Sequence, residues 1–241
     1  MIYIVIPAYD EEKNIGQLLK QIDDVLKGKY LAIVVDDGST DKTGEIVEEM
    51  ASKYPIRCLH NMSNQGLGIT LRNGLREAVN LSLKGDVIIT MDGDATHDPN
   101  YIPSMVEGIN GADVIIASRF LPGAGERGLS NLRKILSRGA GSLLRCAFTI
   151  KDLRDYTSGY RAFKAELIEK AFRDYNEKFI TEKGFSATPE ILIKLRQLDA
   201  KFKEVPFILK YDAKKGTSKI NIPITIVRYL KMIFKFKVRG F

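Results

Sequence analysis

Short apolar runs rich in β-branched residues recur along the chain, and segments with the apolar spacing of amphipathic helices separate them. The strands that they predict occupy residues 2–6, 31–35, 56–59, 87–90 and 114–118, and Arg57 interrupts the third. An unbroken apolar run of this length is typical of a strand that is buried on both faces. Strands of this kind that alternate with helices predict an α/β fold, with a mostly parallel sheet and helices on both faces.

Polar residues follow three of these runs directly. They occupy residues 7–11, 36–41 and 92–94. The carboxyl ends of parallel strands meet at one edge of a sheet, and the ligands of such proteins bind beyond that edge. We therefore expect the three polar clusters to form one binding site.

Two carboxylates, one residue apart, follow the fourth apolar run. The side chains of Asp92 and Asp94 share one side if the strand geometry continues, because strand side chains alternate between faces. Two anions held this close repel each other, and Mg²⁺ or Mn²⁺ prefers such oxygen ligands. The pair predicts a site for one of these cations. On the local sequence alone, a simple polar turn is the alternative.

The composition is that of an ordinary soluble globular protein, with 44% apolar and 28% charged residues among 241. This length suits one large α/β domain. Cys58 and Cys146 lack partners at metal-ligand spacing, and we interpret both as reduced core residues. We expect no signal peptide, and no apolar run reaches the roughly 18 residues of a membrane span. These features predict a cytoplasmic protein.

The positive charge is concentrated near the C-terminus. Residues 201–241 hold eleven Lys or Arg and two acidic residues, a net +9, whereas the whole chain carries +7 and the remainder therefore −2. Such a tail indicates an anionic partner. Nucleic acid is disfavoured, because the few aromatic residues of the tail lie among aliphatic ones and form no stacking platform.

The last segment of the tail has the pattern of a basic amphipathic helix. Apolar residues recur at helical spacing from position 226, with Arg228, Lys231 and Lys235 on another side. This pattern suits a helix that lies in the membrane interface. Packing of the helix against the sheet is the alternative, and the sequence leaves both open.

A glycine-rich segment, residues 121–132, contains a formal match to the dinucleotide-binding fingerprint at 123–128. The match follows the fifth apolar run and not the first, which excludes that interpretation. We expect instead a mobile loop that forms a lid near the acceptor.

Taken together, several segments resemble the family 2 glycosyltransferases with the GT-A fold, and among them the polyprenyl-phosphate transferases such as the dolichol-phosphate mannosyltransferases. The matching segments are residues 6–12, 35–41, 64–68, 91–99, 118–119, 133–140, 157–161, 205–206 and 216–219. They occur in the family's order over nearly the whole chain. The resemblance implies a GT-A catalytic domain over residues 1–220. Residues 221–241 are the basic amphipathic helix, and the lipid-phosphate acceptor that the resemblance implies favours the membrane interface over packing on the sheet.

The resemblance also implies the site residues. The nucleotide-sugar donor would bind to Pro7, Tyr9, Glu11, Asp37, Asp92, Gly93, Asp94 and Arg119. Asp92, Asp94 and Arg119 would be catalytic, and Asp92 and Asp94 would hold Mg²⁺ or Mn²⁺. Thr96 stands where relatives carry a glutamine ligand to the metal, and His97 fits the family pattern. Arg133, Ser137, Arg161 and Lys219 would bind the acceptor phosphate, for which Arg119 is also a candidate.

The chemistry of the acceptor distinguishes two kinds of transferase. A sugar hydroxyl needs a carboxylate base to remove its proton, whereas a phosphate monoester is largely dianionic near pH 7 and needs cations instead. Arginine suits phosphate oxygens well. Glu190, which the relatives also carry, could serve as the base for a hydroxyl acceptor. Ala213 stands where the relatives have an arginine, and Lys214 and Lys215 follow it.

The implied function is metal-dependent, inverting transfer of a hexose, with mannose from GDP-mannose as the first choice, to a polyprenyl or dolichyl phosphate. The enzyme would act peripherally on the cytoplasmic membrane face. A UDP-sugar donor such as UDP-glucose, or a saccharide hydroxyl as acceptor, is the alternative. A membrane-protein partner subunit is a further partner to consider for the tail.

Overall fold

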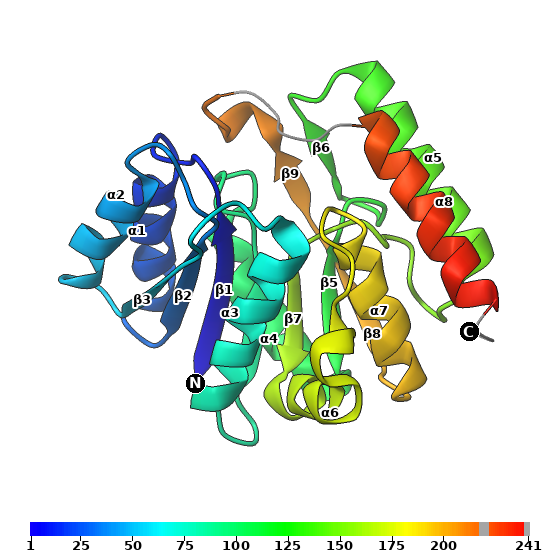
Figure 1. The fold of residues 1–241 in the computed structure, drawn as a ribbon, viewed down its shortest axis with the longest axis horizontal. Coiled ribbons are helices and arrows are strands. Elements are labelled where there is room, and N and C mark those ends of the chain that lie inside the picture. The colour runs from blue at the N-terminus through cyan, green and yellow to red at the C-terminus, as the bar shows by residue number, and fades with distance from the viewer. Residues whose placement is uncertain (217–221, 239–241) are drawn as a thin grey trace.

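A seven-stranded sheet forms the centre of the molecule (Figure 1). The computed structural model describes residues 1–216 and 222–238, without the side chains of 131–133, 135–136 and 222–223. The strands lie in the order β3-β2-β1-β4-β7-β5-β8. Their bounds are β1 Ile2–Ala8, β2 Leu31–Asp36, β3 Ile56–His60, β4 Val87–Thr90, β5 Val114–Ser118, β7 Arg161–Lys164 and β8 Phe202–Pro206. β7 runs antiparallel to β4 and β5, and the other pairs of this sheet are parallel. The predicted α/β fold with a mostly parallel sheet is confirmed.

Helices cover both faces of the sheet (Figure 1). Their bounds are α1 Ile15–Leu26, α2 Thr43–Ala51, α3 Leu67–Leu81, α4 Ile102–Gly108, α5 Asn131–Ala147, α6 Ala165–Tyr175, α7 Ala187–Gln197 and α8 Ile222–Val238. Short 3₁₀ turns cover Pro99–Tyr101, Ile109–Gly111, Asn176–Phe179 and Tyr211–Ala213. Buried side chains of α1, α2 and α4 join one apolar cluster, and those of α3, α6, α7 and α8 join the other.

The strands separate these two clusters, which explains their unbroken apolar runs. In β1, Tyr3 and Val5 belong to the cluster under α3, whereas Ile4 and Ile6 belong to the cluster under α1. Successive strand side chains point to opposite faces, so both faces need apolar residues. The strands β1, β2, β4 and β5 are therefore buried on both faces, whereas the edge strands β3 and β8 are partly exposed.

The glycine-rich segment is not a simple loop. Residues Gly125–Arg127 form β6, which pairs in parallel with β9, residues Ile208–Lys210. The expectation of a mobile loop is wrong for these residues, because a segment more than 80 positions later in the chain supplies a hydrogen-bonding partner. A hairpin signal could not have revealed such a distant pairing.

The helices α5 and α8 lie side by side at one end of the molecule (Figure 1). One face of α8 is buried in the core: Tyr229, Met232 and Phe236 are at most 5% exposed, and the Phe236 ring meets Phe148 edge-on with 6.0 Å between centroids. Part of the helix thus packs against the body, as one of the two alternatives predicted. Among the described residues, no helix is long and apolar enough to span a bilayer.

The cysteines differ from each other. Both are free thiols, as expected. Cys58 is half-buried on β3, but Cys146 is exposed on α5, so its interpretation as a core residue is wrong. The apolar side of α5 that meets the core includes Leu144, which is fully buried.

Candidate active site

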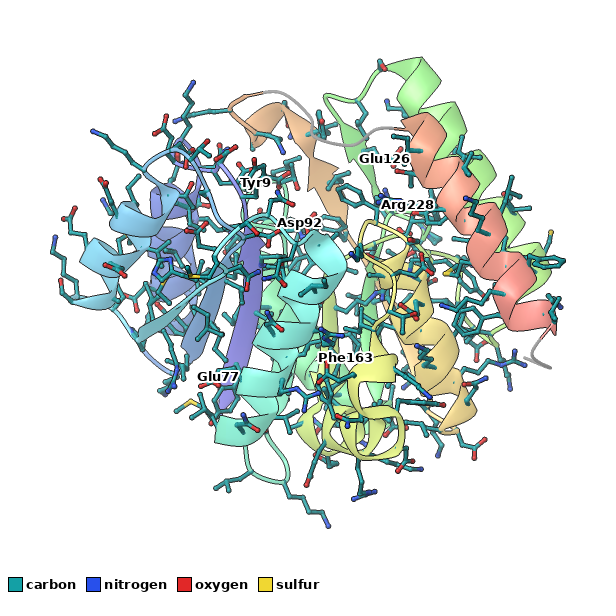
Figure 2. All side chains as sticks on the ribbon, viewed as in Figure 1. Tyr9, Glu77, Asp92, Glu126, Phe163 and Arg228 are labelled. Carbon is teal, nitrogen blue, oxygen red and sulfur yellow. The ribbon has the colours of Figure 1, made fainter. Side chains whose placement is uncertain are left out.

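The carboxyl ends of β1, β2 and β4 bring the three polar clusters to one edge of the sheet, as predicted. The Asp37 amide donates to the carbonyl of Ala8, 2.8 Å away, and a Cβ on Gly93 would lie 3.1 Å from the carbonyl oxygen of Pro7. In Figure 2, Tyr9 and Asp92 lie at this same end of the sheet. We call this edge, residues 7–12, 36–41 and 92–98, the donor rim.

The loops that follow β1 and β2 are tied to each other. The Asp10 carboxylate accepts from the Thr40 amide at 2.8 Å, and the Asp10 amide donates to the Ser39 hydroxyl at 2.9 Å. The Glu11 amide donates to the Thr43 hydroxyl at 2.7 Å. These bonds hold residues 10–12 in the loop, and α1 starts at Ile15.

Asp37 is buried and orders a neighbouring loop. Its carboxylate accepts from the amides of Gln65 and Gly66 at 2.9 and 2.8 Å and from the Asn61 side chain at 2.8 Å. The loop it holds leads into α3, where Gly68 packs against the backbone of Glu182 so closely that a Cβ would lie 1.7 Å from that carbonyl oxygen. Contact of Asp37 with a nucleoside stays a prediction.

The two carboxylates after β4 have different surroundings. Asp94 accepts from the Thr96 hydroxyl at 2.7 Å and from the Lys214 ammonium at 2.8 Å. Asp92 is half-buried, and its Oδ2 lies 3.7 Å from Nε2 of His97. The pair therefore sits at the rim with one carboxylate already matched by a cation and the other open toward solvent.

The pKa values of the two carboxylates are shifted in opposite directions. For Asp92, burial raises the pKa, His97 opposes this and the Asp94 carboxylate adds to it, so the pKa is raised. For Asp94, burial also acts to raise the pKa, but the Lys214 ammonium and the Thr96 hydroxyl outweigh it, so the pKa is lowered. Two interacting anions are expected to behave in this way.

The rim has the chemistry to bind a divalent cation whose remaining ligands are phosphate oxygens. Within residues 1–216 and 222–238, no group of three or more His, Cys, Asp or Glu side chains is arranged to hold a metal ion. Mg²⁺ is commonly held by one or two carboxylates and completed by water and phosphate oxygens. Asp92 and Asp94 can supply that share, while Thr96 is placed to orient Asp94.

His97 has a structural environment. Its Nδ1 accepts from the Asp92 amide at 3.0 Å, and its ring stacks on Tyr160 with 4.9 Å between centroids and meets Phe207 edge-on. The side chain is 4% exposed. These contacts shape the turn that presents Asp92.

Lys214, one of the two lysines that follow Ala213 where relatives carry an arginine, lies at the rim. Its ammonium lies 2.8 Å from Asp94 and 3.5 Å from Glu11, and its side chain is 9% exposed. Although burial lowers the pKa of Lys214, Asp94 and Glu11 raise it above the usual value. The lysine that follows Ala213 thus bridges two of the predicted donor-binding carboxylates.

Arg119 forms a second charged cluster behind the rim. Its guanidinium binds Asp155 in bidentate fashion, with Nε–Oδ2 of 2.8 Å and Nη2–Oδ1 of 2.7 Å. It also donates to Thr157 at 2.6 Å, lies 3.3 Å from Glu126 and reaches Ser137 at 3.5 Å. The structure thus brings together two predicted phosphate ligands, Arg119 and Ser137.

Asp155, which the sequence did not single out, holds this cluster in place. It is fully buried, and burial acts to raise its pKa, but the Arg119 guanidinium outweighs this and lowers it. Burial acts to lower the pKa of Arg119, and Asp155 reverses this. Its loop continues to Gly159, where a Cβ would lie 3.4 Å from Oδ1 of Asp92. One short loop therefore separates the arginine cluster from the donor rim.

The Arg161 side chain, at the start of β7, is buried in the interior and does not lie at the rim. It is 1% exposed and donates to the carbonyls of Thr188 at 2.6 Å and Tyr156 at 3.0 Å. Its Nε has no hydrogen-bond partner among the described residues. These contacts favour an internal, structural role, and its role as an acceptor ligand stays a prediction. Lys219 and the Arg133 side chain lie outside the described part of the chain.

Glu190 is buried and engaged by its own surroundings. It accepts from the amides of Thr181 and Glu182, each at 2.8 Å, and from the Lys194 ammonium at 2.7 Å. The side chain is fully buried. Because the Glu190 carboxylate is buried and already paired with Lys194 and two backbone amides, it is poorly placed to remove a proton from a bound hydroxyl.

Comparison with known proteins agrees with this geometry. The family model described as glycosyl transferase family 2 matches residues 3–172. The chain is 36% identical over 235 residues to a dolichol-phosphate mannosyltransferase of Pyrococcus furiosus, a match that covers 96% of this chain and 62% of that protein. It is 30% identical to an undecaprenyl-phosphate mannosyltransferase of Micrococcus luteus, covering 90% of this chain and 86% of that protein. The chain thus spans less than two thirds of the Pyrococcus relative.

Solved structures show the same fold. Glucosyl-3-phosphoglycerate synthase from Mycobacterium tuberculosis, in complex with Mn²⁺, UDP and glucosyl-3-phosphoglycerate, superimposes with a TM-score of 0.65 at 18% identity. The match covers 97% of this chain and 79% of that one. The fold is therefore that of the GT-A glycosyltransferases, and the chain belongs to glycosyl transferase family 2.

Proposed function

We propose that the chain transfers a hexose, with mannose from GDP-mannose as the first choice, to a polyprenyl phosphate with inversion at the sugar. The carrying observation is the arrangement of two charged clusters on either side of one loop. Asp155 and Thr157 of this loop hold Arg119, and Gly159 lies against Asp92. The names of the Pyrococcus and Micrococcus relatives support a polyprenyl-phosphate acceptor.

The donor rim would hold the nucleoside diphosphate through Asp92 and Asp94. A Mg²⁺ or Mn²⁺ ion shared with the diphosphate would neutralise the charge of the leaving group. The loops after β1 and β2, with Pro7, Tyr9 and Asp37, would surround the nucleoside. Solved structures of glucosyl-3-phosphoglycerate synthase, which has the same fold, are complexes with UDP and Mn²⁺ or Mg²⁺.

The arginine cluster would bind the acceptor. A phosphate monoester is already an anion near pH 7, so a phosphate oxygen can attack the anomeric carbon without a general base. Arg119 and Ser137 would hold its other oxygens, and Asp155 fixes the guanidinium for this purpose. The enclosure of Glu190 disfavours the alternative in which a saccharide hydroxyl is the acceptor.

A UDP-sugar remains the second candidate donor, because the complexes with the same fold contain UDP. Transfer should be measured with GDP-mannose and UDP-glucose, each with and without a short-chain polyprenyl phosphate. We expect product only with the lipid phosphate, more product with GDP-mannose, and loss of product when EDTA removes divalent cations. Equal transfer to a free saccharide without lipid phosphate would overturn the proposed acceptor.

We further propose that the outer face of α8 rests on the cytoplasmic surface of a membrane. Val227, Leu230, Phe234 and Val238 recur at the spacing of one helix face and are 49–71% exposed. Lys231 and Lys237 are exposed on its two flanks. An apolar stripe bordered by lysines suits an anionic lipid surface.

Vesicle sedimentation tests this docking. The protein should bind vesicles that contain phosphatidylglycerol more strongly than vesicles of phosphatidylcholine alone. Leu230→Ser together with Phe234→Ser should abolish binding, whereas Met62→Ser, which removes a fully exposed apolar side chain from another part of the surface, should not. Unchanged vesicle binding by the double variant, or a stable complex with a membrane protein in place of lipid binding, would assign this face to another partner.

A further inference from the structure

A short segment closes over the donor rim from one side. The Lys210 amide donates to the Thr96 carbonyl at 3.2 Å, and its ammonium lies 2.6 Å from Asp98. Five residues later, Lys215 and Asn14 exchange two hydrogen bonds of 2.9 and 3.0 Å. We call residues 210–216 the strap. It is fastened to the turn after Asp94 at one end and to the loop after β1 at the other.

Lys214 lies between these two attachments and points into the rim. Its ammonium contacts Asp94 Oδ2 at 2.8 Å and Glu11 Oε1 at 3.5 Å. The other oxygen of Asp94 accepts from Thr96. A buried ammonium is stable only with such partners, so the lysine and the carboxylates stabilise one another.

This contact competes with a divalent cation. The ammonium occupies the side of Asp94 that faces Glu11, and a cation on the same oxygen would meet both a blocked lone pair and a positive charge. Electrostatic repulsion between two cations at this separation is strong in a partly dry site. A nucleoside diphosphate would remove the conflict, because it brings negative charge for both cations.

We propose that Lys214 is the internal counter-cation of the donor rim. Its ammonium pairs with Asp94 until a complex of the divalent cation and the diphosphate binds, and it then moves to pair with the diphosphate. The inference rests on the proposed function for the presence of a metal and a diphosphate at the rim. It adds a coupling: the divalent cation binds weakly alone and strongly with the nucleotide. Release of Lys214 also requires the strap to loosen next to Asn14.

Binding of Mn²⁺, measured by electron paramagnetic resonance or calorimetry, tests this coupling without a catalytic assay. Lys214→Gln should raise the affinity for Mn²⁺ alone by about tenfold, the equivalent of one charge-assisted hydrogen bond. The same variant should lose most of the gain in Mn²⁺ affinity that GDP gives to the wild type. Lys214→Arg retains the charge and should keep Mn²⁺ binding weak in the absence of nucleotide.

Lys215→Gln is the matched control. Lys215 is exposed, and its recorded contacts to Asn14 use backbone atoms, so the substitution removes the same charge from the same strap. Equal Mn²⁺ affinities for the two glutamine variants would show a general charge effect and overturn the role of Lys214. If the wild type bound Mn²⁺ no better with GDP or UDP, and Asp94→Asn changed nothing, the metal site of the proposed function would itself be wrong.

Discussion

The two charged clusters on either side of the loop 155–159 hold their cations in different ways. Arg119 is gripped in bidentate fashion by a fully buried aspartate and has a further bond to Thr157. Lys214 reaches Asp94 through one ammonium on a strap that is fastened mainly by backbone contacts and by Lys210. A guanidinium fork fixes geometry, whereas an ammonium is a point charge on a flexible stem. The comparison indicates a rigid cluster around Arg119, which we propose for the acceptor, and an exchangeable cation at the rim that we propose for the donor.

Asp155→Asn should have the largest effect on folding. It removes the charge that neutralises buried Arg119, and breaking a buried pair costs about 3–5 kcal/mol of unfolding free energy. Urea unfolding measures this loss. Asp212→Asn, at an exposed aspartate 3.7 Å from Arg127, should change stability by less than about 0.5 kcal/mol. Equal stability of the two variants would contradict a rigid Arg119 cluster.

Asp94→Asn should act mainly on activity at the donor rim. The neutral amide can still bond to Thr96, and Glu11 still faces the Lys214 ammonium, so the loss of stability should be smaller than in Asp155→Asn. A weaker grip on the cation should lower transfer at least about 100-fold. Initial rates with saturating acceptor and varied Mn²⁺ measure this effect. Transfer close to the wild-type rate would remove the metal site from the rim.

Arg119→Lys tests whether the bidentate geometry of the guanidinium is needed, or only its positive charge. The charge is kept, but the bidentate bond to Asp155 and the bond to Thr157 cannot both be made. We expect the KM for the polyprenyl phosphate to rise about tenfold, the loss of one charge-assisted hydrogen bond. The KM for the nucleotide sugar should stay unchanged; a rise in that KM alone would place Arg119 on the donor side.

Acidification should weaken the Arg119 cluster by a smaller amount. The folded-state pKa of Asp155 lies below its unfolded value of about 3.9. Its contribution is thus fully present above pH 5 and is lost as the pH falls through 3.9 toward the folded value. Between pH 5 and pH 3, the unfolding free energy should fall less steeply with pH in Asp155→Asn than in the wild type. The slopes should differ by up to about 1.4 kcal/mol per pH unit, which corresponds to the uptake of one proton. Equal slopes would show that Asp155 does not titrate with folding.

Local patterns in the sequence predicted the architecture and the donor rim. Apolar runs and helical spacing depend on near neighbours, so the strands, the two-sided helix cover and the meeting of residues 7–11, 36–41 and 92–94 could be inferred. The unbroken apolar character of the strands had a direct physical cause in the two core clusters. The contacts that tie the loops together, such as those of Asp10 with Ser39 and Thr40, join distant segments and have no signal in the local sequence.

The partners of the charged groups could not be predicted in this way. Lys214 lies 120 positions from Asp94, and Asp155 lies 36 positions from Arg119. Neither pair has a spacing that local chemistry would mark. The same is true of β6, which depends on β9 for its pairing. Only the folded chain shows which of many lysines and aspartates meet.

The antiparallel strand β7 gives the protein a particular order of assembly during synthesis. It lies between β4 and β5, although it follows both in the chain. The strands β1 to β4 can pair as they leave the ribosome, but β4 then presents an open edge until residues 161–164 arrive. Unpaired edges are templates for wrong pairing, and such delays favour aggregation. Slow translation between β5 and β7 would therefore lengthen the period in which a nascent chain needs a chaperone.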